Sequence, residues 1–566
     1  MEFSPPFPYA NTMTHTSLMS KPSVEPFAFS RLDTAFARFL EQRATLDDAQ
    51  KTTFKQLVLK LSYHHNQGHN CIVVDDDEQA LTLASGLAMT ADTVEKAALL
   101  PLVLEQNRLY LQRYWDYENQ LTHQIKVIAS HHYDVENLDA LLDIYFGKQS
   151  KDTDWQREAA RIAVQHSFSI ITGGPGTGKT TTVVKILAVL QALATEPLLI
   201  ALAAPTGKAA MRLQESIGFN KTALPCSELI KSHIPETVTT LHRLLGAKRD
   251  SPYFKHDANH PLIHDLVVVD EASMVDLALM SKLLDALKPN ARLILLGDKD
   301  QLASVESGAV LADLTQALPA HTVELKTAHR FDENIKQLAV AVNEQEVETA
   351  WQFLNSNNEN TLLLDGDLIT YIASQQVAYL KLIHQNADFS DCYQAFNRFQ
   401  VLCSNREGKN SVADINVRVE QKLAQQGRIQ ITGLWYVGRP VLVTQNNPTL
   451  HLYNGDVGLC LPDKNQGGKL MVFFQRPDGS VKSYLPSRIT QCETVFAMTI
   501  HKSQGSEFEE VLIVLPDLIN PVLTKELLYT AITRAKKTVK LVADKAVFTA
   551  TIQQKVARMT GLVAKF

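Results

Sequence analysis

The stretch of sequence that decides the fold is Gly173-Gly174-Pro175-Gly176-Thr177-Gly178-Lys179-Thr180. It fits the pattern G-x-x-x-x-G-K-[S/T] and follows an apolar run that predicts a strand. Glycines at this spacing let backbone N–H groups curl around phosphate oxygens, and the following helix N-terminus adds a positive dipole. We expect Lys179 to reach the β- and γ-phosphates of ATP and Thr180 to offer its hydroxyl to Mg²⁺. The expected nucleotide-binding residues run on to Thr181.

A second motif supplies acidic groups about 90 residues after this glycine-rich stretch. Leu266–Val269 is a fully apolar run that predicts a buried strand, and Asp270 and Glu271 follow it directly. A carboxylate at Asp270 suits Mg²⁺, and Glu271 is placed to polarise an attacking water. A third apolar run ends in Gly297-Asp298-Lys299-Asp300-Gln301, and we expect the Gln301 amide near the γ-phosphate.

From residue 150 onward, short β-type runs alternate with helical patterns. This alternation predicts parallel sheets covered by helices, with ligands at the carboxyl ends of the strands. The expected strands are Phe168–Thr172, Leu198–Ala204, Leu266–Asp270, Arg292–Leu296, Gln400–Cys403, Val511–Leu515 and Val539–Val542.

Residues 431–490 depart from this pattern. Asn454-Gly455 and Asp478-Gly479 are hairpin-turn signals between short β-type runs. They predict a small antiparallel barrel or sheet inserted into an α/β domain.

The region before residue 130 is expected to be mostly helical. Its segment Leu109–Glu118 is dense in aromatic residues and predicts a helix. Two interpretations stay open for it: packing into a core, or a surface for DNA or a partner chain.

Composition excludes several classes of protein. The 566 residues suggest three to four domains. Lys and Arg number 55 against 61 Asp and Glu, giving a net charge of −6. A polybasic protein that binds nucleic acid through its overall positive charge is therefore excluded. The six cysteines form no C-x-x-C pair, and no apolar run approaches a membrane helix. We expect a cytoplasmic protein with reduced thiols and no membrane contact.

The motifs, taken in order, resemble those of superfamily 1 DNA helicases over residues 155–540. The resemblance assigns Gln156 to reading adenine, and it assigns Arg330 and Arg534 to binding phosphate from a second lobe. His329 and Ala328 before Arg330 depart from the Ser-Tyr expected there. With Lys179, Asp270, Glu271 and Gln301, these arginines complete the expected catalytic set.

The resemblance also implies a track for single-stranded DNA across both lobes. Its contacts would fix the phosphate backbone without reading bases. The residues expected on it are Thr206, Lys208, Thr240, His242, Thr499, His501, Lys502 and Ser503.

The ends of the chain narrow the resemblance to the RecD chains of exodeoxyribonuclease V, the RecBCD helicase–nuclease. This implies RecB-like and RecC-like partners in a heterotrimer, and 5′ to 3′ movement from double-strand ends in recombinational repair. Nuclease activity is expected only from a partner chain. The alternatives are a stand-alone RecD-like helicase and a DNA-end-binding regulatory subunit that uses ATP only as a switch.

The expected architecture has two RecA-like motor lobes. We expect a helical partner-docking domain over 1–120, a first motor domain over 121–330, a second over 331–430 and 486–566, and a small SH3-like β subdomain over 431–485.

Overall fold

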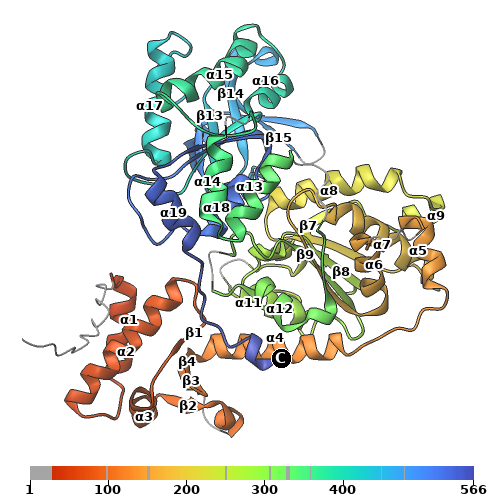
Figure 1. The fold of residues 1–566 in the computed structure, drawn as a ribbon, viewed down its shortest axis with the longest axis vertical. Coiled ribbons are helices and arrows are strands. Elements are labelled where there is room, and N and C mark those ends of the chain that lie inside the picture. The colour runs from red at the N-terminus through yellow and green to blue at the C-terminus, as the bar shows by residue number, and fades with distance from the viewer. Residues whose placement is uncertain are drawn as a thin grey trace, which may run out of the picture.

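The computed structural model describes residues 28–96, 100–148, 153–248, 251–304, 307–326, 332–356, 359–447, 449–476 and 479–566. Figure 1 shows three bodies: an N-terminal domain, a first lobe beside it, and a second lobe above. The last residues descend from the second lobe, pass the first lobe and end beside helix α4 (Figure 1).

The first lobe is built on a parallel sheet whose strand order within the described residues is β10-β5-β9-β8-β6-β7. The expected strands at Phe168–Thr172 and Leu266–Val269 are present as β5 and β8, and all their residues are buried. Buried strands of this kind need helices on both faces of the sheet, which this lobe supplies. The elements are α5 Leu138–Phe146, α6 Trp155–Gln165, β5 Phe168–Thr172, α7 Lys179–Leu193, β6 Ile200–Ala204, α8 Gly207–Thr222, α9 Glu228–Ser232, β7 Val238–Thr240, α10 Leu241–Leu244, β8 Leu266–Val269, η2 Ala272–Met274, α11 Leu277–Asp285, β9 Arg292–Gly297, α12 Val310–Ala317, η3 Pro319–His321 and β10 Thr322–Glu324.

The second lobe repeats this plan with a parallel sheet in the order β11-β20-β19-β12-β18. Its largest buried cluster joins these strands to the helices around them. The elements are α13 Glu333–Asn343, α14 Val347–Asn355, β11 Thr361–Leu363, α15 Leu368–His384, α16 Phe389–Phe396, β12 Phe399–Cys403, α17 Val412–Gln425, β18 Ala497–Thr499, η6 His501–Ser503, β19 Phe508–Val514, α18 Lys525–Ile532, β20 Ala535–Val542 and α19 Lys545–Gln553. The last element of the chain, η7 Val563–Lys565, lies against the first lobe instead.

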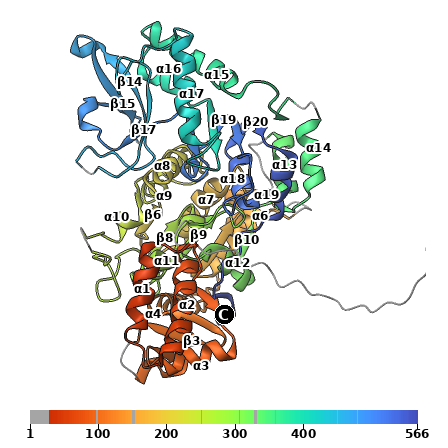
Figure 2. The same cartoon turned by 90° about the vertical axis from the view of Figure 1, so that its left-hand side faces the viewer.

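An antiparallel sheet interrupts the second lobe between α17 and β18. Its order is β16-β15-β14-β13-β17, and its strands run from residue 440 to 494, beyond the expected end at 485. Figure 2 shows it beside helices α16 and α17, away from the first lobe's sheet. The elements are β13 Pro440–Val443, β14 Val457–Asp463, η4 Lys464–Gln466, β15 Lys469–Gln475, β16 Val481–Tyr484, η5 Pro486–Arg488 and β17 Cys492–Thr494.

The N-terminal domain differs from the mostly helical expectation, because it also contains a mixed sheet in the order β1-β4-β3-β2. The aromatic segment Leu109–Glu118 begins in strand β4 and becomes helical only at Gln112. Its elements are α1 Arg31–Glu41, α2 Asp48–Asn66, β1 Cys71–Val73, α3 Asp76–Ala84, β2 Ala88–Thr90, η1 Ala91–Lys96, β3 Leu102–Glu105, β4 Arg108–Leu111 and α4 Gln112–Ala129.

Helix α4 joins the N-terminal domain to the first lobe and runs across the expected boundary at residue 120. Leu121 and Ile125 are fully buried in a first-lobe core cluster, where Tyr114 and Tyr117 also pack. Tyr110 is fully buried as well. Of the two interpretations, core packing therefore describes Tyr110, whereas Tyr114 and Tyr117 are only partly buried and a partner surface stays open for them.

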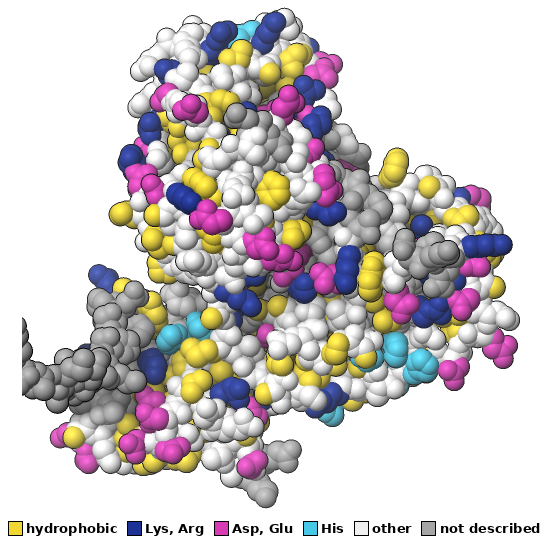
Figure 3. Space-filling model, in the orientation of Figure 1, with side chains coloured by type: hydrophobic (Ala, Val, Ile, Leu, Met, Phe, Trp, Pro, Cys, Tyr) yellow, Lys and Arg dark blue, Asp and Glu magenta, His cyan; other side chains and the backbone are white. Residues whose placement is uncertain are grey.

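Charged side chains of both signs are interspersed over the face in Figure 3. Among the described residues, no helix is long and apolar enough to cross a membrane.

Candidate functional site

The phosphate loop lies where β5 ends and α7 begins. Gly178 is the residue before α7 and has a φ of 85°, a left-handed conformation that favours glycine. A Cβ atom at Gly178 would also lie 2.5 Å from Nε2 of Gln156. The Gln156 amide donates to the carbonyl of Thr177 at 3.3 Å. The structure thus brings the expected adenine-reading residue against the loop.

Lys179 is the first residue of α7, and its Nζ turns back over the loop. It donates to the carbonyls of Gly173 at 2.6 Å and Gly174 at 3.0 Å. The ammonium group therefore lies on the concave side of the loop, where phosphate oxygens can replace these acceptors. Thr181 points elsewhere, since its hydroxyl donates to Oδ1 of Asn220 on α8 at 2.9 Å.

Asp270 and Glu271 follow β8 as expected. Burial and the neighbouring Glu271 raise the pKa of Asp270 to about 6, and Lys179 opposes that rise. A buried acid with a raised pKa is a group that a divalent cation stabilises in its charged form. Glu271 has a φ of 51°, a conformation rare outside glycine and asparagine and one that clusters at functional sites.

Gln301 is almost fully buried at the tip after β9. Its Nε2 donates to Oδ2 of Asp298 at 2.9 Å, which fixes the orientation of the amide. Burial is the main cause that raises the pKa of Asp298 to about 6. The Gln301 carbonyl oxygen consequently faces the second lobe.

Arg534 meets that oxygen from the other side of the cleft. Its Nη2 donates to Oε1 of Gln301 at 2.6 Å, and its Nε donates to the carbonyl of Thr530 at 3.1 Å. The side chain is 2% exposed, and burial lowers the pKa of its guanidinium. An arginine in this position lies in trans to the phosphate loop. Arg330, the other expected arginine, lies outside the described residues.

Tyr529 is a second cross-lobe group, which the sequence analysis did not single out. Its hydroxyl donates to Oδ2 of Asp298 at 3.1 Å and lies 3.1 Å from the position of a Cβ on Gly174. It lies in α18, which ends at Ile532, two residues before Arg534. Its position close to Arg534 in the sequence was the available signal.

An ion pair also joins the lobes. Arg212 of α8 contacts Glu507 of the second lobe at 2.5 Å, and Lys536 lies 3.2 Å from the same carboxylate. Burial alone would raise the pKa of Glu507, but these two cations outweigh it and lower the pKa to about 2.

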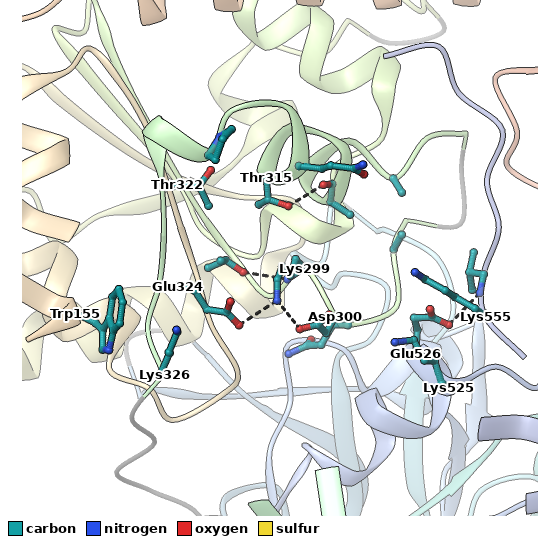
Figure 4. Close-up of a pocket in the computed structure, with 18 residues that line it drawn as sticks. Trp155, Lys299, Asp300, Thr315, Thr322, Glu324, Lys326, Lys525, Glu526 and Lys555 are labelled. Carbon is teal, nitrogen blue, oxygen red and sulfur yellow. Dashed lines mark hydrogen bonds and ion pairs between the residues drawn. The ribbon is translucent and has the colours of Figure 1, made fainter. Parts of the chain in front are cut away.

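A cavity of about 570 Å³ opens beside Gln301, between the first lobe and the start of α18. Figure 4 shows Lys299 between Glu324 and Asp300, with each oxygen 3.0 Å from its Nζ. Nζ of Lys326 lies 4.5 Å from the centre of the Trp155 ring, next to Gln156. Gln301 and Thr172 border the cavity, whereas the loop residues 173–180 do not.

The residues expected to contact DNA lie at the carboxyl ends of strands in both lobes. In the first lobe Ala204 and Thr240 are direct neighbours across β6 and β7. In the second lobe Thr499 ends β18, beside Cys403 of β12. Two separate sequence motifs are therefore brought to one edge of the first lobe's sheet, and the motif that begins at Thr499 lies at the end of a strand in the second lobe.

Several of these side chains are already engaged within the protein. The hydroxyls of Thr206 and Thr240 cap α8 and α10, and Thr499 accepts from the backbone of Lys502. The Lys502 ammonium pairs with Glu493 at 2.6 Å. Ser503 is fully buried and donates to the carbonyl of Ile500 at 2.7 Å.

The remaining three expected DNA contacts are basic or imidazole groups. Burial lowers the pKa of Lys208 to about 8, and Arg212 contributes to the same shift. Burial also lowers the pKa of His501. The His242 ring packs edge-on to Phe254 at 5.7 Å between centres.

Two family models match the chain. A model described as an AAA domain matches residues 156–307, and one described as a UvrD-like helicase C-terminal domain matches residues 494–542. These ranges contain the phosphate loop of the first lobe and Arg534 of the second. The fold and site thus define a two-lobed, P-loop, nucleotide-using motor protein of helicase type.

The chain belongs to the RecD family. It is 41% identical to the RecBCD enzyme subunit RecD of Mycolicibacterium smegmatis, over 80% of this chain and 81% of that protein. It is 35% identical to the RecBCD enzyme subunit RecD of Haemophilus influenzae, over 91% and 87%. The ATP-dependent RecD2 DNA helicase of Deinococcus radiodurans is 33% identical, over 66% of this chain and 46% of that protein.

Solved structures give a partial likeness. A Bacteroides Pif1 helicase in complex with ADP-AlF3 and single-stranded DNA aligns with a TM-score of 0.38 and 18% identity, over 69% of this chain and 93% of that one. The Pif1 helicase from Candida albicans aligns with a TM-score of 0.38 and 16% identity, over 71% and 97%.

Proposed function

We propose that this chain is the ATP-dependent DNA helicase subunit of a RecBCD-type exodeoxyribonuclease V. It moves 5′ to 3′ on single-stranded DNA from double-strand ends, and it acts in a cytoplasmic heterotrimer with RecB-like and RecC-like chains. The single observation that carries the proposal is the contact between Arg534 and Gln301 across the cleft. It joins a second-lobe arginine to the residue expected to read the γ-phosphate.

The proposed chemistry divides among the site residues by position. Lys179 and the loop amides hold the phosphates, while Thr180 and Asp270 hold Mg²⁺. Magnesium sites commonly use one or two protein ligands plus phosphates and waters. This fits the finding that the described residues contain no cluster of three or more acidic, histidine or cysteine ligands. Bound Mg²⁺ neutralises charge on the phosphates.

The remaining steps fall to side chains around the phosphates. Glu271 orients and polarises the attacking water. Arg534, together with Arg330, stabilises the charge that develops on the transferring phosphate. Gln301 senses whether that phosphate is present. Gln156 reads the base.

Movement follows from the two lobes. ATP attracts Arg534 toward its phosphates, and phosphate loss removes that attraction, so nucleotide shifts the population between lobe arrangements. DNA held by the strand-end residues Thr206, Lys208, Thr240, His242, Thr499, His501 and Lys502 would then be passed between lobes. The buried Ser503 supports the turn that carries its neighbours. We propose the expected four-part domain division, with α4 assigned to the first lobe's core and the inserted sheet extended to Thr494.

The test is ATP turnover by the purified chain with and without single-stranded DNA. Strong stimulation is expected, followed by unwinding of substrates with a 5′ overhang in preference to a 3′ overhang. Turnover that ignores DNA would contradict the motor and favour ATP as a switch. Co-purification from the native cell tests the heterotrimer, and a stand-alone helicase would come without two large partner chains.

A further inference from the structure

The last residues of the chain connect all three bodies. The backbone N–H of Val556 donates to Oε2 of Glu526 in the second lobe at 3.1 Å. Leu562 is fully buried in a first-lobe core cluster, and Lys565 pairs with Glu105 of the N-terminal domain at 2.5 Å. Figure 1 shows this path from α19 down to α4. We name residues 555–566 the C-terminal strap.

Midway along the strap, Arg558 holds the segment that follows Gln301. Its Nη1 donates to the carbonyl of Gly308 at 2.9 Å, and its Nη2 donates to the carbonyl of Ser304. The guanidinium carbon also lies 3.0 Å from the position of a Cβ on Gly68, so it packs against the N-terminal domain. One side chain thus touches two bodies.

The N-terminal domain contacts the same segment directly. The backbone N–H of Gly308 donates to the carbonyl of Gly68 at 3.0 Å. The Ser307 hydroxyl lies 3.1 Å from Nδ1 of His65. Both contacts come from the end of α2 and the turn after it.

The other end of the segment belongs to the ATP site. The backbone N–H of Leu302, next to Gln301, donates to the Thr530 hydroxyl at 2.8 Å, and its carbonyl accepts from Gln504 at 2.9 Å. Only a few residues therefore separate Gln301 and its second-lobe contacts from Ser304 and Gly308, whose carbonyls Arg558 binds.

The strap is fixed to the N-terminal domain by a buried carboxylate. Oε1 of Glu118 accepts from Asn70 at 2.9 Å, and from the Thr560 hydroxyl and the Gly561 N–H at 3.2 Å each. The backbone N–H of Met559 donates to the imidazole Nδ1 of His69, and the Met559 carbonyl accepts from the backbone N–H of Asn70, both at 2.9 Å. A Cβ on Gly561 would lie 2.0 Å from the Tyr110 hydroxyl, so the strap fits here only with glycine.

We infer that Arg558 is a positioning residue for ATP hydrolysis, and that the strap makes the alignment of Gln301 depend on the N-terminal domain. Small displacements of a group that meets the reacting phosphate are costly in rate. This inference rests on the proposed ATPase function.

The test uses the full chain with Arg558→Ala, Arg558→Lys and Gly561→Ala. Arg558→Ala removes both carbonyl contacts, and Arg558→Lys restores part of them. Gly561→Ala displaces the strap where it meets the N-terminal domain. The control is Lys545→Ala on α19, which breaks a surface ion pair with Glu348 of α14. We expect kcat with DNA to fall roughly 3- to 30-fold in the Arg558→Ala and Gly561→Ala chains. The KM for ATP should stay unchanged, and Arg558→Lys should recover part of the loss.

Hydrogen exchange separates positioning from general destabilisation. Amides of residues 302–304 and 307–310 should exchange faster in both disruptive variants, while those of β5 keep the wild-type rate. Should Arg558→Ala fail to fold, Arg558→Lys carries the same comparison. Wild-type kcat and wild-type exchange at 302–304 and 307–310 in the variants would overturn the inference. A wild-type chain without DNA-stimulated ATPase would instead overturn the proposed function.

Discussion

Nη2 of Arg534 and Oε1 of Gln301 lie 2.6 Å apart, which joins the two lobes through the residues expected to meet the γ-phosphate. Asp298 sets this arrangement, because it accepts from the Gln301 amide nitrogen and leaves the oxygen for the arginine. A phosphate group arriving between the lobes competes for the same guanidinium. Nucleotide binding must therefore exchange a protein–protein bond for a protein–phosphate bond, and this exchange is a direct route from ATP to lobe movement.

Replacing Arg534 with alanine should lower kcat far more than it weakens ATP binding. The charge of Arg534 matters most when negative charge develops on the transferring phosphate, and a supplied arginine contributes roughly 10³–10⁵ in rate. Steady-state ATPase kinetics with single-stranded DNA measure both parameters. Arg428→Ala, at an exposed position of the second lobe, should leave both unchanged. An unaltered kcat in the Arg534→Ala chain would restrict this arginine to bridging the lobes.

Lys179→Gln should reduce ATP hydrolysis to background while leaving the fold intact. Its Nζ donates to the carbonyls of Gly173 and Gly174, so the loop backbone can survive the loss of charge. ATPase assays and circular dichroism check the two halves of this statement. Lys185→Gln is the matched control on α7, since Lys185 lies over the Phe146 ring at 4.8 Å. Normal turnover in a folded Lys179→Gln chain would refute the phosphate-site assignment.

Asp298→Asn should change how stability depends on pH. Burial raises the pKa of Asp298 from 3.8 to about 6, so the folded protein holds this proton more tightly than the unfolded chain. Its charged form is therefore a cost that grows as pH rises from about 4 to about 6, reaching roughly 3 kcal/mol. Asparagine carries no such cost, and its amide oxygen can still accept from Tyr529 and Gln301.

The melting temperature at several pH values provides the measurement. Relative to the wild type, the Asp298→Asn chain should gain stability between pH 4.5 and pH 7.5. Asp300→Asn is the control, because that neighbour is half-buried rather than enclosed. A difference between the chains that stays constant with pH would show that Asp298 does not titrate in this window.

Local patterns in the sequence were sufficient for the inner strands of the two lobes, whereas the three-residue edge strands β7, β10, β11 and β18 were not predicted. A fully apolar run such as Leu266–Val269 must be covered on both faces, and the polar residues after it must then lie at one sheet edge. The N-terminal sheet was missed because β1 to β4 are only three to four residues long, too short for alternation to separate them from helix. Cross-lobe contacts such as that between Tyr529 and Asp298 join residues 231 positions apart, and no spacing rule reports on them.

Exposed apolar side chains on α1 offer a second candidate for the expected partner surface. Leu32 and Phe39 there are 72% and 50% exposed, and Arg43 lies over the Phe39 ring at 3.6 Å. Exposed apolar residues beside arginine are typical of protein interfaces. Leu32→Asp with Phe39→Asp should therefore abolish co-purification with the large partner chains and keep DNA-stimulated ATPase. Neither side chain belongs to the buried cluster of this domain, so its fold should survive.

Leu229→Asp, at a 70% exposed position on α9, is the matched control and should still assemble. Assembly by the double variant would place the docking surface elsewhere, whereas loss of assembly by the control as well would show that any exposed charge disrupts it.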